Sequence, residues 1–208
     1  MIKKVFLAIA MVLCVANASA QDDKKNVLVV YGGPQLSTAS NTGGVTGKFS
    51  YLGGLQYERN GMFGEDFGLY GGIEYTAKGT KDFTFVDGHK DDYNLNYVQL
   101  NLGVKYAKEI WGINGFGEIG PYVAYGIGGE SEQGTTGYKG DSFGDYGENF
   151  GFNNLDFGFR VAIGAEFSGF RVMAGYQQGL MNIADKQLIS NGYKNYGFFA
   201  AIGYGFKF

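Results

Sequence analysis

The chain ends in the stretch YGFFAAIGYGFKF, residues 196–208. Every second residue of this stretch is apolar, whereas the residues between them are mostly small or polar. The apolar set is Tyr196, Phe198, Ala200, Ile202, Tyr204, Phe206 and Phe208. Because side chains alternate between the two faces of a β-strand, these two sets lie on opposite faces. A strand with so long an apolar face is typical of contact with lipid, and similar segments recur upstream.

Seven upstream segments alternate in a comparable way. They are Val27–Ser37, Phe49–Arg59, Phe67–Lys78, Asn94–Tyr106, Ile113–Ile127, Leu155–Phe167 and Phe170–Gly179. Each has about 10–15 residues, close to the length that a tilted membrane strand needs. In lipid every backbone polar group must be paired, so strands cross a membrane only as a closed barrel. The sequence therefore predicts an all-β fold, an eight-stranded antiparallel up-and-down transmembrane β-barrel.

The amino terminus has the three parts of a secretory signal peptide. Two lysines precede the apolar run Val5–Ala16, and the small residues Ala18–Ala20 follow as a cleavage site. We expect residues 1–20 to be a signal peptide and residues 21–208 to be one barrel domain. The single cysteine, Cys14, lies within the apolar run, so the mature chain has no thiol chemistry and no cysteine metal site.

The predicted connections alternate between short and long. The short ones are Asn60–Asp66, Ala107–Gly112 and Ser168–Gly169, and the long ones are Thr38–Lys48, Gly79–Tyr93, Gly129–Asn154 and Leu180–Asn195. Barrels of the outer membrane have short periplasmic turns and long extracellular loops, which predicts that both termini are periplasmic. Four aromatic residues near the short turns are expected to form a girdle at the membrane interface: Phe63, Trp111, Phe170 and Phe208.

The inward positions of the predicted strands carry both signs of charge. They are Glu74, Glu118, Asp156 and Glu166 against Lys78, Lys105, Arg160, Arg171 and Lys207. An eight-stranded barrel has room only for its own side chains, so these charges must be paired. A two-residue turn at Ser168–Gly169 places Glu166 opposite Arg171, and Arg160 is expected near Glu118. We favour a network that fills the lumen, while a narrow or gated ion path remains the alternative.

Four segments give the chain a family resemblance. They are GGPQLS at Gly32–Ser37, EYTAKG at Glu74–Gly79, GPY at Gly120–Tyr122 and GYGFKF at Gly203–Phe208. The chain resembles the small PorT-like outer-membrane β-barrel proteins of Gram-negative bacteria, and its plan is similar to OmpA/OmpX-type barrels. The resemblance implies an outer-membrane location. It also implies that Tyr204, Phe206 and Phe208 are the terminal signal read by the barrel-assembly machinery.

The long segment Gly129–Asn154 is the candidate recognition loop, because it combines acidic and aromatic residues. Its candidate residues are Glu130, Glu132, Tyr138, Asp141, Phe143, Asp145 and Tyr146. It could bind divalent cations between lipid phosphates or present aromatic rings to a protein partner, but a flexible surface loop without a ligand is the simpler interpretation. The only histidine, His89, matches no metal-ligand spacing and is expected in a solvated loop.

We therefore expect a structural or binding protein that acts through its extracellular loops. Its expected partners are outer-membrane lipid and lipopolysaccharide, the assembly machinery, and a protein at the loops. Cofactors, metals and nucleic acid are not expected, since no nucleotide motif or basic patch is present. The alternatives are an accessory of a secretion or envelope-assembly complex and a lipid-modifying enzyme. With one histidine, and with only the Asp141–Ser142 dipeptide as an acid–serine pair, we expect no enzyme.

Overall fold

The computed structural model describes residues 26–40, 46–84, 90–145, 147–185, 189 and 192–208. Its strands are β1 (Asn26–Ser40), β2 (Thr46–Arg59), β3 (Phe67–Thr84), β4 (Lys90–Ile110), β5 (Ile113–Gly128), β6 (Glu130–Gln133), β7 (Lys139–Asp141), β8 (Leu155–Phe167), β9 (Phe170–Gly179) and β10 (Lys194–Lys207). The predicted signal peptide, His89 and Tyr146 lie outside the described residues. Within those residues, no helix is long and apolar enough to cross a membrane.

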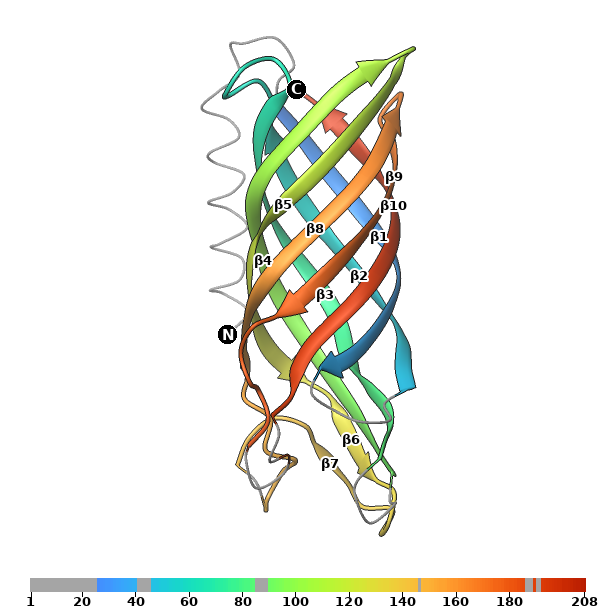
Figure 1. Ribbon diagram of the computed structural model, residues 1–208, viewed down its shortest axis with the longest axis vertical. Helices are drawn as coiled ribbons and strands as arrows, with labels where there is room; N and C mark the ends of the chain where they lie inside the picture. The colour runs from blue at the N-terminus through green and yellow to red at the C-terminus, as the bar shows by residue number, and fades with distance from the viewer. Residues whose placement is uncertain (1–25, 41–45, 85–89, 146, 186–188, 190–191) are drawn as a thin grey trace.

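Eight of the strands close into a ring. Each pairs with the next in the order β1, β2, β3, β4, β5, β8, β9 and β10, and β10 pairs with β1. Every pairing in the ring is antiparallel, so the wall has no open edge. The short β6–β7 hairpin lies in the β5–β8 connection, and β6 pairs with the start of β4. The predicted eight-stranded up-and-down barrel is confirmed (Figure 1).

The alternation of side chains along the strands separates a lipid-facing wall from a buried interior. In β10, Phe198 and Ile202 are 60% and 72% exposed, whereas Phe199 is 4% exposed. The same alternation holds along β8, where Ile163 is exposed and Arg160 is fully buried. Large apolar side chains on the outside of a closed barrel have a favourable environment only in lipid. The predicted inner and outer faces are therefore those of the folded chain.

Two of the predicted long connections are shorter than expected. The structure continues β1 to Ser40 and starts β2 at Thr46, and it continues β3 to Thr84 and starts β4 at Lys90. The predicted connections Thr38–Lys48 and Gly79–Tyr93 were therefore wrong in their bounds. Apolar alternation ends where lipid contact ends, but antiparallel pairing continues beyond it, so the pattern marks only the lipid-facing part of each strand.

Two of the three short connections are tight turns at one end of the barrel, and the third is Asn60–Asp66, as predicted. β4 continues to Ile110, so the predicted turn Ala107–Gly112 contracts to Trp111–Gly112. Both turn residues have positive φ, 55° and 78°, and Ser168–Gly169 has 48° and 85°. Two-residue turns of this kind match the twist of the strands that they join. These turns and the C-terminus lie at the upper end in Figure 1, opposite β6 and β7.

At the other end of the barrel, the described residues of the connections 129–154 and 180–193 pack on the ends of the strands. Twelve buried residues form one apolar cluster there: Ala39, Tyr93, Leu95, Tyr97, Tyr122, Ala124, Phe150, Phe152, Ile183, Ala184, Ile189 and Tyr193. The ring of Phe152 packs edge-on against Tyr93 at 5.0 Å and against Tyr193 at 5.2 Å. We call these two connections, with the apolar cluster beneath them, the loop cap. Burial raises the pKa of the Tyr193 hydroxyl, which lies 3.3 Å from Thr80 Oγ1.

Candidate functional site

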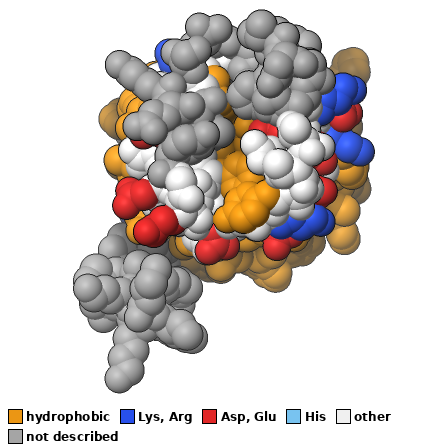
Figure 2. All heavy atoms as spheres, turned by 90° about the horizontal axis from the view of Figure 1, so that it is seen from below, with side chains coloured by type: hydrophobic (Ala, Val, Ile, Leu, Met, Phe, Trp, Pro, Cys, Tyr) orange, Lys and Arg blue, Asp and Glu red, His pale blue; other side chains and the backbone are white. Residues whose placement is uncertain are grey.

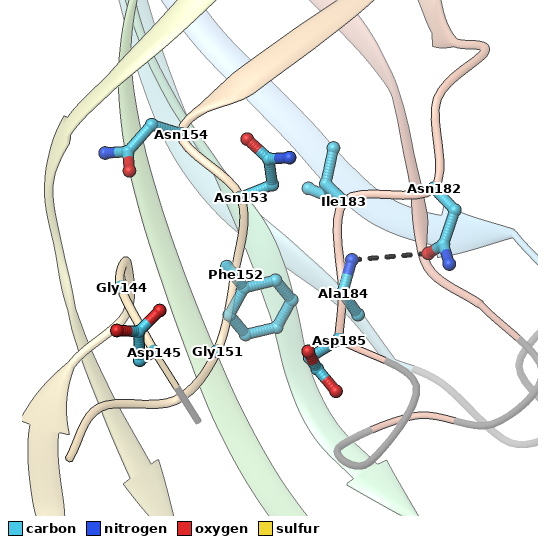
Figure 3. Close-up of a pocket in the computed structure, with 10 residues that line it drawn as sticks. All are labelled: Gly144, Asp145, Gly151, Phe152, Asn153, Asn154, Asn182, Ile183, Ala184 and Asp185. Carbon is cyan, nitrogen blue, oxygen red and sulfur yellow. Dashed lines mark hydrogen bonds between the residues drawn. The ribbon is translucent and has the colours of Figure 1, made fainter. Parts of the chain in front are cut away.

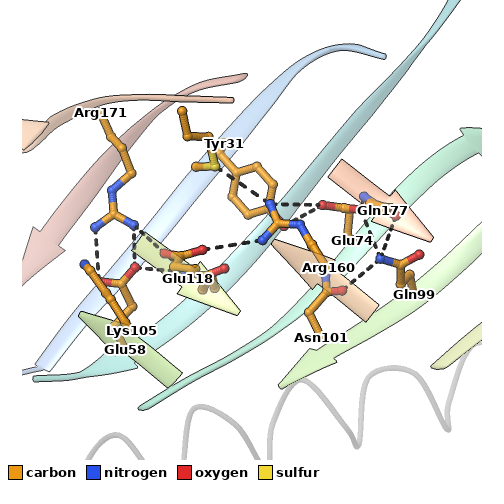
Figure 4. Close-up of polar contacts among 12 residues, drawn as sticks. Tyr31, Glu58, Glu74, Gln99, Asn101, Lys105, Glu118, Arg160, Arg171 and Gln177 are labelled. Atoms are coloured by element: carbon orange, nitrogen blue, oxygen red, sulfur yellow. Dashed lines mark hydrogen bonds and ion pairs between the residues drawn. The ribbon is translucent and has the colours of Figure 1, made fainter. Parts of the chain in front are cut away.

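Arg171 of β9 is the centre of a charged cluster near the short-turn end of the lumen. Its Nη2 atom lies 3.0 Å from Glu58 Oε2 and 2.8 Å from Glu166 Oε2, while Nη1 contacts the other Glu58 oxygen. Lys105 Nζ lies 2.5 Å from Glu58 Oε2. The strand register also pairs Glu166 with Arg171, so that prediction is confirmed. Glu58 thus joins β2 to β4 and β9 across the lumen (Figure 4).

Arg160 of β8 is the centre of a second group, farther from the short turns. Its Nη1 atom lies 3.4 Å from Glu118 Oε2, as predicted, and its Nη2 atom lies 3.9 Å from Glu74 Oε2. Tyr31 donates a hydrogen bond of 2.8 Å to the same Glu74 oxygen. Gln56 links the two groups, because its Nε2 atom lies 2.9 Å from both Glu58 Oε1 and Glu118 Oε1. The interior is therefore one connected network.

Two further ion pairs extend the network to both ends of the lumen. Below the loop cap, Lys78 Nζ lies 3.3 Å from Asp156 Oδ2, which also accepts a hydrogen bond from Tyr122. At the short-turn end, Lys207 Nζ of β10 lies 2.9 Å from Glu166 Oε1. The side chain of Lys207 is 46% exposed, so the network is not fully enclosed at the short-turn end.

The charges of the network balance. Five carboxylates (Glu58, Glu74, Glu118, Asp156 and Glu166) face five cations (Lys78, Lys105, Arg160, Arg171 and Lys207). Alternation along Phe49–Arg59 puts Glu58 on the inner face, but the predicted network did not include it. The excess of one cation among the nine predicted charges was the signal that pointed to a missing carboxylate, since an unpaired buried charge is costly.

Aromatic rings and polar side chains fill the space around these charges. The Arg160 guanidinium lies 4.5 Å from the centroid of Phe199, and the guanidinium of Arg171 lies 4.6 Å from that of Phe116. A cavity beside Lys78 and Tyr122 has a volume of about 10 Å³, which is about the space of one water molecule. Cations held over ring faces and paired with carboxylates form an ordered interior.

The residues of the candidate recognition loop have different surroundings. Glu130 and Asp141 are exposed and lie opposite each other in the β6–β7 hairpin, and Glu132 pairs with Lys139 at 3.2 Å. Tyr138 stacks on Phe150 at 5.9 Å. Residues 130–141 of the segment thus form a hairpin rather than an open loop.

Phe143 points toward the mouth of the barrel. It packs edge-on against Tyr97, with ring centroids 5.3 Å apart, and it is partly buried against the apolar cluster of the loop cap. Its ring therefore contributes to the packing of the cap, and its role toward a protein partner stays a prediction.

Asp145 lines a hollow between the two connections of the loop cap (Figure 3). The hollow has a volume of about 490 Å³, and its lining includes Asp185, Asn182, Asn153 and Asn154. Sequence reasoning did not find Asn182 and Asp185, because nothing in the sequence shows that residues about forty positions apart meet. Among the described residues, no group of three or more His, Cys, Asp and Glu side chains is placed to hold a metal ion.

The predicted terminal assembly signal lies on the outer face at the short-turn end. Tyr204 packs against Phe170 at 5.1 Å and against Phe206 at 4.9 Å, and all three rings are exposed on the wall. Phe208 follows the end of β10, and its backbone N–H donates to the carbonyl of Asn26 at 3.0 Å. Its role in assembly stays a prediction.

A closed eight-stranded barrel with an apolar outer wall and a charge-paired interior defines an integral membrane protein of the β-barrel class. The chain belongs to the family described as outer membrane protein beta-barrel domain, which matches residues 19–185. It is thus an outer-membrane barrel of a Gram-negative bacterium. No curated protein matches its sequence significantly.

Three solved structures are similar to this chain in fold. OprG from Pseudomonas aeruginosa is 12% identical to this chain, with a TM-score of 0.48. The match covers 89% of this chain and 97% of the OprG chain. Ail of Yersinia pestis, solved with the heparin analogue sucrose octasulfate, is 16% identical, with coverages of 88% and 99% and a TM-score of 0.45. Neisserial surface protein A is 9% identical, with coverages of 88% and 97% and a TM-score of 0.45.

Proposed function

We propose that this barrel is a surface-recognition protein whose loop cap binds the basic segment of a protein partner. The observation that carries the proposal is the hollow of about 490 Å³ between the two cap connections, with Asp145 and Asp185 in its lining. Five carboxylates of these connections are exposed: Glu130, Asp141, Asp145, Glu148 and Asp185. Seen from the loop end, acidic side chains lie around much of the rim, and basic side chains lie among them mainly on one side (Figure 2). Such a surface attracts cations and repels polyanions.

The proposal includes an orientation in which the loop cap is extracellular and both termini are periplasmic. The lengths of the connections support it, since the short turns lie at one end and the long connections at the other. It also includes kinship with the PorT-like proteins, which the four matching segments of the sequence support. Lipid partners follow from the apolar wall.

The role that we propose involves no chemistry. Ser142 is fully buried, and its hydroxyl lies 2.8 Å from Ser131 Oγ and 2.5 Å from the carbonyl oxygen of Asn94. The adjacent Asp141 is exposed on the opposite face of the chain. The dipeptide therefore lacks the arrangement of a nucleophile activated by a base. The charge-paired interior likewise supports a filled lumen over an ion path.

The test compares fluorescent oligolysine and oligoglutamate peptides on cells that display the wild type. The double variant Asp145→Asn/Asp185→Asn should bind oligolysine several-fold more weakly, and the difference should shrink as salt is added. The matched control is Glu65→Gln/Glu109→Gln, which removes two exposed carboxylates at the short-turn end. Equal binding of both peptides, or unchanged binding by the double variant, would refute the proposal.

A further inference from the structure

The wall of the barrel has one irregular place between β2 and β3. The ladder pairs Gly47 with Thr80 and next pairs Leu52 with Thr76, so four residues of β2 face three of β3 across an interruption. The other edge of the same β2 segment keeps its pairing, since Lys48 faces Ser37 and Tyr51 faces Pro34 of β1. β2 therefore remains attached to β1 while it separates from β3.

Side chains from β1 compensate for this separation on the inner face. Gln35 Nε2 donates to the carbonyl of Ala77 at 3.2 Å, and Ser37 Oγ donates to the carbonyl of Gly79 at 3.0 Å. Both donors are buried in the lumen and reach across β2 to the backbone of β3. Within a membrane barrel an unpaired carbonyl is costly, so these bonds allow the wall to stay open here.

The outer face of the interruption is a groove of about 580 Å³, which we call the wall groove. Its lining residues are Pro34, Lys48, Phe49, Ser50, Tyr51, Tyr75, Ala77, Asn94, Asn96 and Glu130. The part nearer the middle of the wall is apolar, with the rings of Tyr51 and Tyr75 stacked at 5.7 Å, and the part nearer the loop cap is polar. The volume is within the range of pockets that bind small molecules.

The position of the wall groove is at the membrane interface. Along β4 the outward residues Val104, Leu102 and Leu100 are exposed and apolar, whereas Asn96 and Asn94, nearer the loop cap, are polar and half-buried. The change from apolar to polar marks the boundary of the lipid, where tyrosines are common. The groove therefore opens into the headgroup region of the leaflet on the loop side.

We propose that the wall groove binds the sugar–phosphate headgroup of a glycolipid of the outer leaflet. Tyr51 and Tyr75 offer ring surface to a sugar, Lys48 offers a cation to a phosphate, and Asn96 and Glu130 offer partners to hydroxyl groups. An amphipathic groove continuous with the lipid-facing wall fits a membrane amphiphile better than a soluble ligand. The proposal uses the orientation proposed above and is independent of the peptide binding by the loop cap.

Native mass spectrometry of the detergent-folded full chain with purified lipid A tests the proposal. Tyr75→Ala and Lys48→Ala should each weaken retention of lipid A about tenfold, since one aromatic or charged contact is commonly worth about that factor. The matched control is Tyr176→Ala, an outward half-buried tyrosine on the opposite wall that packs on Phe198 at 5.0 Å. Heat-modifiable migration on a gel verifies that each variant is folded.

Three results would overturn the proposal: lipid A binding unchanged in both groove variants, an equal loss in Tyr176→Ala, or equally tight retention of phosphatidylethanolamine. Lys48→Ala keeps the test decisive if Tyr75→Ala does not fold, because the lysine head can be removed without loss of an aromatic contact. The peptide-binding assay on cells is a separate experiment, so a failure of one proposal can be told apart from a failure of the other.

Discussion

The substitution Glu58→Gln, a conservative change in the lumen, should strongly destabilise the barrel. Glu58 is fully buried and is contacted by Arg171, by Lys105 at 2.5 Å and by Gln56 at 2.9 Å. Glutamine keeps the size of the side chain but removes its charge. Arg171 retains Glu166 at 2.8 Å, whereas Lys105 loses the carboxylate that holds it.

The expected cost follows from this difference. A charge pair about 4 Å apart gains about 4 kcal/mol at an effective dielectric constant near 20. Removing one partner of a buried pair commonly costs about 3–5 kcal/mol, because the other charge stays buried without compensation. We expect a loss of about 3 kcal/mol in the free energy of unfolding. The double variant Glu58→Gln/Lys105→Met should recover most of it, since charge balance returns.

Urea unfolding of the barrel in phospholipid vesicles measures this loss. The single tryptophan, Trp111, is fully exposed on the short turn and reports the transfer of that turn from the membrane interface to water. Glu109→Gln is the control for loss of a carboxylate outside the lumen. A midpoint for Glu58→Gln within error of the wild type, or a double variant as unstable as the single one, would refute the network as a source of stability.

Other changes have equally definite outcomes. Gly158→Ala should lower the free energy of unfolding by about 1–3 kcal/mol in the same assay, because a Cβ there would lie 2.0 Å from the Gln178 carbonyl oxygen. Gly117→Ala, whose Cβ would lie 3.9 Å from the nearest atom, should leave the free energy of unfolding unchanged. Phe152→Ala should expose the loop cap to protease in folded protein, since truncation of a buried ring costs about 3–5 kcal/mol; resistance equal to the wild type would contradict the cap's apolar core. The raised pKa of Tyr193 means that its neutral form stabilises the cap up to about pH 10 and that this stability is lost as the pH rises further. Protease cleavage of the cap should therefore increase there more steeply in the wild type than in Tyr193→Phe. Deletion of Phe208 should reduce the heat-modifiable protein recovered from membranes, and unchanged recovery would exclude it from the assembly signal.

The sequence predicted the strands because lipid imposes alternation on each of them. Leu155–Phe167 and Phe170–Gly179 have the predicted bounds, and the pairing of Glu166 with Arg171 followed from the two-residue turn between them. The sequence could place charged residues such as Arg160 inside the barrel, because alternate residues along a strand point to opposite faces of the wall.

The loop cap and the wall groove were not predictable in this way. The contact of Phe152 with Tyr193 and the approach of Asp185 to the hollow depend on tertiary packing, for which the sequence has no periodic pattern. The extension of β3 to Thr84 was missed because alternation of polarity ends with the lipid. The groove depends on a single extra residue in β2, and its compensation by Gln35 comes from a different strand.

The distribution of the charged network over the chain also constrains the order of assembly. The Glu166–Arg171 pair forms within one hairpin, but Glu58 meets Lys105 and Arg171 from positions 47 and 113 residues away. Until β1 and β10 pair, Glu58 and Arg171 lie toward opposite ends of an open sheet, and water takes the place of their contact. A half-built sheet would have to carry that water into the bilayer, at a cost that grows with every inserted strand. The network therefore favours insertion as a single concerted closure, with the β8–β9 hairpin formed first and the hydrated interior drying only when the cylinder is complete.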